Sequence, residues 1–175
     1  IQINVMGEVI QPGTYALSAF STVFHTLYRA GGVSGIGSLR NVKVSRGGQT
    51  VATVDVYQFI MQGKTRDDIR LEEGDVIIAP AYEELVQITG NVKRPMRYEM
   101  KKGETLSTLL KYAGGFTSDA YTKSLRIVRQ NGKEYQVNTV DDTDYSVCQL
   151  HDGDVITAEA ILDRFTNKLE VRGAV

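Results

Sequence analysis

The chain has 175 residues, of which 42% are hydrophobic and 23% are charged, as in an ordinary globular protein. Its 20 basic and 21 acidic side chains give a formal net charge of −1, so the charge does not point to nucleic acid or anionic lipid as a partner. The longest apolar run, Val76–Ala79, is far shorter than the ~18 residues of a membrane-spanning helix, and a single cysteine, Cys148, excludes a disulfide within the chain.

One pattern occurs twice along the chain, and its beginning occurs a third time. Val5–Pro12 and Ala30–Gly32 return 83 positions later as Ile88–Pro95 and Ala113–Gly115 (88 − 5 and 113 − 30), and Val171–Val175 start the pattern again. This period exceeds the ~20–50 residues of solenoid repeats and fits a small domain with its own core. We therefore predict a first domain at 1–83, a second at 84–168, and the first strand of a third repeat at 169–175.

Each repeat is predicted to begin with a β-hairpin. In the first repeat Ile3 and Val5 alternate with polar residues, as in a half-buried strand. Gly7, at the end of this strand, indicates a bulge or a close approach of two backbones. A turn at Gln11–Gly13 then leads into a second strand at Thr14–Leu17.

A helix is predicted to follow the hairpin, from an N-cap at Ser21 or Thr22 to Ala30. Val23, Leu27 and Ala30 form its apolar face, at the spacing i, i+4 and i+7. The second repeat keeps this face apolar with Leu106, Leu110 and Ala113. The glycine pair after each helix indicates a left-handed residue at the helix end.

A second hairpin is predicted to turn at Gly47–Gly48, and its counterpart at Asn131–Gly132. Asp55–Gln62 is predicted to be a second short helix, whereas the equivalent stretch Asn138–Tyr145 is predicted to be a shorter helix or a single turn. A turn and a final strand complete each repeat, at Leu71–Ile77 and Leu150–Ile156. Each repeat is thus predicted to be a small α+β domain with one main helix packed on a mixed sheet.

Three motifs recur in the same order in both repeats. They are Val-x-Gly-x-Val-x-x-Pro-Gly-x-Tyr from Val5, a short helix that ends in Ala-Gly-Gly, and Leu-x-x-Gly-Asp-x-Ile from Leu71. Together they resemble the SLBB (soluble ligand-binding β-grasp) family, whose tandem copies are characteristic of outer-membrane proteins of polysaccharide biosynthesis and export. The second repeat departs from the pattern at Met96, where the family prefers glycine, and this leaves its turn type open.

The resemblance implies two tandem β-grasp domains of ubiquitin-like topology in the periplasmic part of a Gram-negative export assembly. It implies three kinds of partner: the exported polysaccharide, other copies of the protein in a homo-oligomeric ring, and an inner-membrane polysaccharide co-polymerase. The family's lipidated export domain is not in this sequence, so attachment to the outer membrane is implied only for the full-length protein. We expect the full-length protein to form a ring and this segment alone to be monomeric or weakly associating.

Basic residues at equivalent positions are the main candidates for a repeated ligand contact. Arginine can bind the carboxylate or phosphate groups of an acidic glycan through its planar fork. The candidates are Lys43, Arg46, Arg126 and Arg129, together with the equivalent tyrosines Tyr15 and Tyr98, on which a sugar could stack. The alternative is that the charges at strand ends are solvated and the tyrosines belong to the core or its rim.

No recognisable catalytic or metal-binding motif occurs. Asp75 and Asp154 would be the carboxylates of a hydrolase, but a Gly-Asp turn that bonds its own backbone explains them more simply. His25 and His151 lack metal-ligand spacing, and Cys148 has no histidine nearby. We therefore predict a non-enzymatic structural and interaction segment of a capsular or exopolysaccharide export protein, without a cofactor. The alternative is a glycan-binding module.

Overall fold

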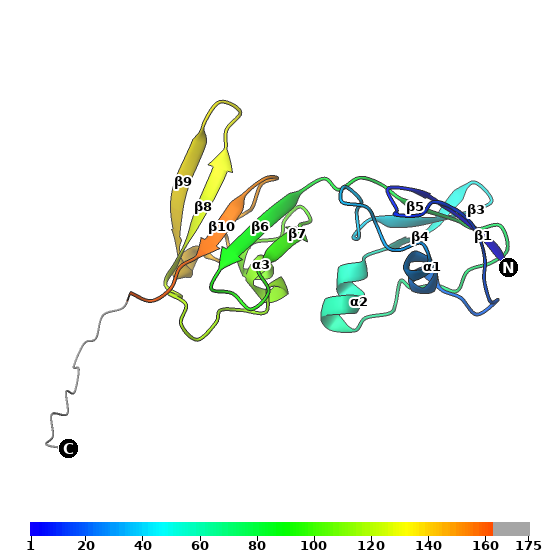
Figure 1. Ribbon diagram of the computed structural model, residues 1–175, viewed down its shortest axis with the longest axis horizontal. Helices are drawn as coiled ribbons and strands as arrows, with labels where there is room; N and C mark the ends of the chain where they lie inside the picture. Colours follow the sequence, from blue (N-terminus) through cyan, green and yellow to red (C-terminus); the bar gives the residue numbers. More distant parts are fainter. Residues whose placement is uncertain (163–175) are drawn as a thin grey trace, which may run out of the picture.

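The computed structural model describes residues 1–162, which form two domains of the same design (Figure 1). The first domain contains β1 (Gln2–Gly7), β2 (Gly13–Ala16), α1 (Val23–Arg29), β3 (Val42–Arg46), β4 (Gln49–Val54), α2 (Val56–Gln62) and β5 (Val76–Ala79). The second contains β6 (Leu85–Gly90), β7 (Met96–Glu99), α3 (Leu106–Tyr112), β8 (Ser124–Gln130), β9 (Tyr135–Asp141), a 3-10 turn η1 (Asp142–Asp144) and β10 (Val155–Ala158). The third repeat, predicted at 169–175, lies outside the described residues.

Each domain is built on a five-stranded mixed sheet. The strand order is β2-β1-β5-β3-β4 in the first domain and β7-β6-β10-β8-β9 in the second. The first and last strands of each domain pair in parallel, with Val5 beside Ile77 and Ile88 beside Ile156, and the other pairs are antiparallel. This is the β-grasp topology, and the prediction of two tandem α+β domains is confirmed.

The helices complete a separate apolar core in each domain. The predicted face of α1 is buried at Val23, Leu27 and the capping residue Ala30, and α3 buries Leu106, Leu110 and Ala113 in the same way. Beneath α1 lie inward-facing strand residues such as Ile3 and Val5. Helices of seven residues are marginal alone, so this burial is what stabilises them.

One glycine in each domain lets the parallel first and last strands come close together. Gly7 has a φ of +86°, and a Cβ built there would lie 2.3 Å from the carbonyl oxygen of Ala79. Gly90 has a φ of +88°, and its Cβ would lie 2.1 Å from the carbonyl oxygen of Ala158. The close backbone approach predicted at the end of the first strand is therefore present in both domains.

The two inner hairpins differ at their turns. Between β3 and β4 the turn is the predicted pair Gly47–Gly48, both with positive φ. Between β8 and β9 the loop has four residues, 131–134, rather than the two predicted. The Asn131 side-chain oxygen accepts hydrogen bonds from the backbone N–H groups of Lys133 (3.1 Å) and Glu134 (2.9 Å), and this stabilises the longer loop.

The second short helix is present in the first domain only. Asp55 caps α2 by accepting a hydrogen bond from the Tyr57 N–H, and Gly63 ends the helix with a φ of +65°. In the stretch Asn138–Tyr145, the prediction of a single turn holds for residues 142–144. It is wrong for residues 138–141, which extend β9, because the longer hairpin pairs as far as Ser124 and Asp141.

Residues 80–84 connect the two sheets, and the predicted boundary at 83/84 lies within them. The connection is fixed to the loop before β3, because the Ser38 N–H donates to the carbonyl of Pro80 at 2.7 Å and the Tyr82 N–H donates to that of Ile36 at 2.9 Å. The molecule is elongated, and α2 lies on the side of the first domain that faces the second (Figure 1). Among residues 1–162 no helix combines the length and apolar character needed to cross a bilayer.

Candidate functional site

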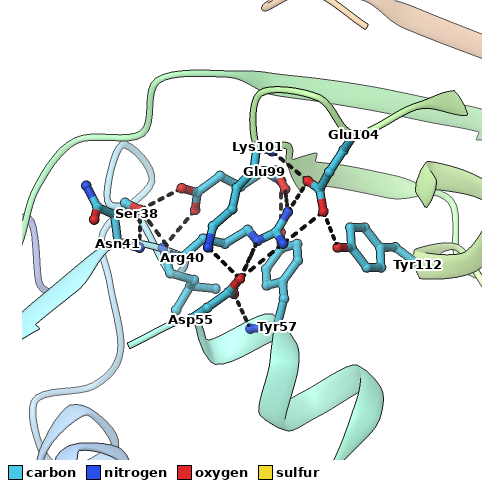
Figure 2. Close-up of polar contacts among 10 residues, drawn as sticks. Ser38, Arg40, Asn41, Asp55, Tyr57, Glu99, Lys101, Glu104 and Tyr112 are labelled. Carbon is cyan, nitrogen blue, oxygen red and sulfur yellow. Dashed lines mark hydrogen bonds and ion pairs between the residues drawn. The ribbon is translucent and has the colours of Figure 1, made fainter. Parts of the chain in front are cut away.

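A cluster of buried charged groups lies where the two domains meet, around Arg40 (Figure 2). Arg40 is in the loop before β3 and is only 2% exposed. Its guanidinium donates to the Asp55 carboxylate at 3.1–3.3 Å, to both carboxylate oxygens of Glu104, at 3.0 Å for Oε2, and to the backbone carbonyl of Glu99 at 3.2 Å. One cation therefore joins the first domain, which supplies Asp55, to two segments of the second.

Two tyrosines enclose the Arg40 guanidinium. Its central carbon lies 4.8 Å from the centre of the Tyr57 ring and 5.3 Å from that of Tyr112. The two rings meet edge to face, with centroids 5.3 Å apart. Tyr57 comes from α2 of the first domain but packs in the apolar core of the second. Cation–π attraction and apolar burial therefore act at the same place.

Further hydrogen bonds between the two domains surround this cluster, and each involves at least one side chain. The carboxylate of Glu99, which is 8% exposed, accepts from the Ser38 hydroxyl at 2.5 Å and from the Leu39 N–H at 2.8 Å. The Glu99 N–H in turn donates to the Tyr57 hydroxyl at 2.8 Å. These reciprocal bonds fix the end of β7 against the first domain.

Local structure holds each carboxylate in place before the domains meet. Asp55 is fixed within the first domain as the N-cap of α2 and by its pair with Arg40. Lys101 Nζ of the second domain approaches it to 2.8 Å only when the domains join. Glu104 accepts from the Lys101 N–H at 2.6 Å and from the Tyr112 hydroxyl at 2.6 Å. The site is therefore preorganised, which limits the entropy lost when the two faces join.

The ionised forms of Asp55 and Glu104 are favoured. Burial would raise the pKa of Asp55, but hydrogen bonds from Arg40 and Lys101 outweigh burial and leave that pKa below its ordinary value. Burial acts in the same direction on Glu104, and hydrogen bonds from Arg40 and Tyr112 likewise leave its pKa lowered. Burial, reinforced by the neighbouring Glu104, raises the pKa of the Tyr112 hydroxyl, which therefore stays a neutral donor.

A small cavity of about 250 Å³ opens beside this cluster. Arg40 and Glu99, which line its inner side, are already bonded to protein groups, and Lys101 and Lys102 line it as well. Arg40, Asp55, Lys101 and Glu104 are engaged with one another, and none of them forms a nucleophile–base pair. The arrangement is suited to joining domains rather than to a reaction.

The predicted arginines are engaged inside their own domains. Arg46 forms a bidentate pair with Asp75, with both N–O distances at 2.8 Å, and Arg129 forms the same pair with Asp154 at 3.0 and 2.9 Å. The arginine side chains are 32% and 23% exposed, whereas the aspartates are fully buried. In both domains this pair ties the inner hairpin to the turn before the last strand.

The other predicted residues also lie in separate places. Lys43 is exposed on β3, and Arg126 is exposed on β8 within 3.3 Å of Glu159. The Tyr15 and Tyr98 hydroxyls donate to the carbonyls of Gln11 and Arg94, four residues earlier, and so fix equivalent hairpin turns. The structure therefore does not gather these basic residues and tyrosines into one site.

The carboxylates considered for hydrolysis do not converge. Asp75 accepts from the Glu72 N–H, and Asp154 accepts from the His151 N–H, each at 2.8 Å within its own turn. His25 accepts from the Thr22 N–H at the start of α1, and Cys148 is partly buried against the second core. Among residues 1–162, no group of three or more His, Cys, Asp or Glu side chains is placed to hold a metal ion.

Sequence reasoning missed the junction residues altogether. Arg40, Glu99 and Glu104 have no identical counterpart 83 positions away, where Lys123, Ala16 and Ser21 stand. The search for equivalent positions therefore passed over them. For Glu99 and Glu104 the available signal was a charged residue in one repeat and a small residue in the other, whereas Arg40 and Lys123 are both basic and gave no such signal.

The fold and its motifs define the class of protein. Two models of the SLBB domain match residues 2–79 and 85–138, which together make up most of the chain. The chain therefore belongs to the SLBB family and contains two SLBB domains in tandem. Two curated relatives from Escherichia coli, both described as polysialic acid transport protein KpsD, are each 31% identical to it over 84 residues. The match spans 48% of this chain but only 15% of each relative.

Proposed function

We propose that this chain is a non-enzymatic structural segment of a polysaccharide export protein, in which the two SLBB domains act as one rigid connector. The observation that carries the proposal is the burial of Arg40 between carboxylates of both domains. Separating the domains would break the Arg40–Glu104 and Lys101–Asp55 pairs and the hydrogen bonds of Glu99. It would also expose the Tyr57 ring, which is buried in the core of the second domain. The chain then contributes a fixed orientation of two domains to the assembly, and its buried charged groups maintain that orientation.

The family and the relatives support a role in export. SLBB domains match both halves of the chain, and the E. coli relatives are described as transporting polysialic acid. We place the segment in the periplasm of a Gram-negative envelope, as part of an outer-membrane-associated protein for a capsular or exopolysaccharide. Its proposed partners are further copies of the same protein in a ring and an inner-membrane co-polymerase.

Replacing Arg40 in the protein that contains this segment tests the proposal. Cells that depend on the Arg40→Met variant should display less polysaccharide on their surface, whereas Lys123→Met, at the equivalent position of the second domain, should leave the amount unchanged. Immunoblots should show equal amounts of both variants in the envelope. Normal export by an Arg40→Met protein whose domains are demonstrably uncoupled would refute the rigid-connector function.

Recognition of the exported polysaccharide is the second candidate function. The exposure of Lys43 and Arg126, on equivalent strands, favours testing it at these two residues. Titration calorimetry with acidic oligosaccharides should give heat that is lost in Lys43→Ala/Arg126→Ala and retained in a Lys133→Ala control. The absence of heat at millimolar oligosaccharide would exclude this candidate and leave the connector function untouched.

A further inference from the structure

An open apolar groove of about 570 Å³ lies between α1 and α2 of the first domain. Its apolar lining comes from both helices: Phe24, Leu27, Tyr28, Val56, Phe59 and Ile60. The Phe24 and Phe59 rings contact each other with centroids 4.2 Å apart, and Tyr28 and Ile60 are 87% and 61% exposed. Large apolar side chains gathered at one exposed place mark a contact surface rather than a random distribution.

The fold does not require this groove. At the equivalent positions of α3, Phe24, His25 and Tyr28 are replaced by Ser107, Thr108 and Lys111. The second domain also has η1 in place of α2, so one wall of the groove has no counterpart there. Since both domains fold with the same topology, the apolar surface of the first domain serves something other than folding.

A projecting apolar element is found on the second domain. The β8–β9 hairpin continues past the strand beside it, because β10 pairs with β8 only at Arg126–Val128, and it extends away from the body of the domain (Figure 1). Tyr135 and Val137 point to the same face of β9 and are 69% and 63% exposed. From Tyr135 to Val140 this edge strand carries no charged residue, although charges are the usual protection of an exposed edge.

We propose that the β8–β9 hairpin of one copy docks in the α1–α2 groove of a second copy, with Tyr135 and Val137 entering between the helices. Alternate residues of a strand lie on one face roughly 6–7 Å apart, so both side chains can contact the open groove of about 570 Å³ together. The lining of the groove includes Arg29 and no carboxylate, and Glu134 stands beside Tyr135 on the hairpin. Both surfaces are therefore apolar, and the exposed Arg29 offers Glu134 an opposite charge.

A second copy is the occupant that accounts for both surfaces at once. Within one chain the hairpin extends from the upper side of the second domain, whereas α1 and α2 lie at the lower side of the first (Figure 1). The contact is head-to-tail, since each copy has one hairpin and one groove, and such contacts close into a ring when the rotation permits. The closure of these contacts into a ring rests on the proposed function. The docking of the hairpin in the groove does not, and the experiments below test the docking alone.

The contact is small compared with interfaces that bury about 1,200–2,000 Å², so one contact alone is weak and is best captured covalently. In a Cys148→Ser background, Ile60→Cys and Glu134→Cys chains should form a disulfide-linked dimer when mixed under mild oxidation. A mixture of Lys111→Cys and Glu134→Cys, which places the first thiol on α3, should give at least tenfold less dimer. Adding Tyr135→Ser to the Glu134→Cys chain should reduce the Ile60→Cys cross-link to that background.

Complementation distinguishes docking from pairing of two hairpin edges. Tyr28→Glu disables the groove and Tyr135→Glu disables the hairpin, and both positions are exposed enough to leave the fold intact, as circular dichroism would verify. At high concentration the unmodified chain should sediment as a series of oligomers and each variant as a monomer, while their mixture should stop at a dimer. A Glu134→Cys chain that cross-links mainly to itself, or a mixture that stays monomeric, would overturn the proposal.

Discussion

Replacing Arg40 by methionine tests the physical basis of the junction most directly. Methionine keeps the length and apolar stem of the side chain but removes the cation that Asp55 and Glu104 share. The matched control is Lys123→Met, at the equivalent position of the second domain, where the side chain is 72% exposed and lies 3.7 Å from Asp142. Both variants lose one positive charge, so the difference between them reports the burial of the side chain that is replaced.

The expected magnitude follows from that burial. Removing one partner of a buried ion pair costs about 3–5 kcal/mol. The lower end applies to the association of the domains, because Arg40 and Asp55 lie in the same domain and only the pair with Glu104, whose side chain is 18% exposed, crosses the junction. Arg40→Met should therefore weaken the association of the domains by about 3 kcal/mol, whereas the exposed pair at Lys123 contributes at most about 1 kcal/mol.

Amide hydrogen exchange measures this weakening at two reporters. The Leu39 N–H donates to the Glu99 carboxylate, and the Glu99 N–H donates to the Tyr57 hydroxyl, so both are protected only while the domains are joined. A loss of about 3 kcal/mol should accelerate their exchange by about 100-fold. Amides in the centre of β6 should be unaffected. Acceleration below about threefold, or an equal effect in Lys123→Met, would refute the argument.

Three further predictions concern the domains and the pH. Gly90→Ala should destabilise the second domain by at least about 1 kcal/mol more than Gly103→Ala. The two glycines have nearly the same φ, +88° and +89°, but only at Gly90 would the added Cβ lie 2.1 Å from a carbonyl oxygen. Chemical denaturation followed by circular dichroism measures the difference. Asp75→Asn and Asp154→Asn should each destabilise their own sheet by about 2–3 kcal/mol, seen as local loss of exchange protection. Across the junction, Arg40 lowers the pKa of Glu104 and Lys101 lowers that of Asp55. The stabilisation from these two pairs is present above the ordinary carboxylate pKa and is lost as the pH falls below about 4. The radius of gyration from X-ray scattering should rise there, with far-UV dichroism unchanged.

The repeat allowed the fold to be predicted from the sequence, because positions that match 83 residues apart do the same work in both domains. Gly7 and Gly90 allow the same close approach, and Tyr15 and Tyr98 fix the same turn. The predicted ligand-binding arginines match for the same reason. Arg46 and Arg129 each hold a buried aspartate of their own domain, so these two arginines repeat because both domains use the same structural pair. Their proposed contact with a glycan remains a prediction.

The junction could not be found in this way, since it requires the two domains to differ. Arg40 of the first domain meets Glu104 of the second, and Lys101 of the second meets Asp55 of the first, so Glu104 stands where the first repeat has Ser21. Which charged residue becomes buried depends on how the domains are oriented, and no local pattern records that orientation. The extension of β9 was missed for a similar reason, since it depends on pairing with Ser124, a residue distant in the sequence.

The parallel pairing of β1 with β5, and of β6 with β10, has a consequence for how such proteins grow. A chain that enters a module along one strand and leaves it along a neighbour running the same way must emerge at the far end. Each module is thus a link whose entrance and exit are opposed, so adding another copy lengthens the molecule without rebuilding the links already present. Gene duplication could lengthen such a protein by one domain at a time, provided that each new junction between domains evolves complementary surfaces.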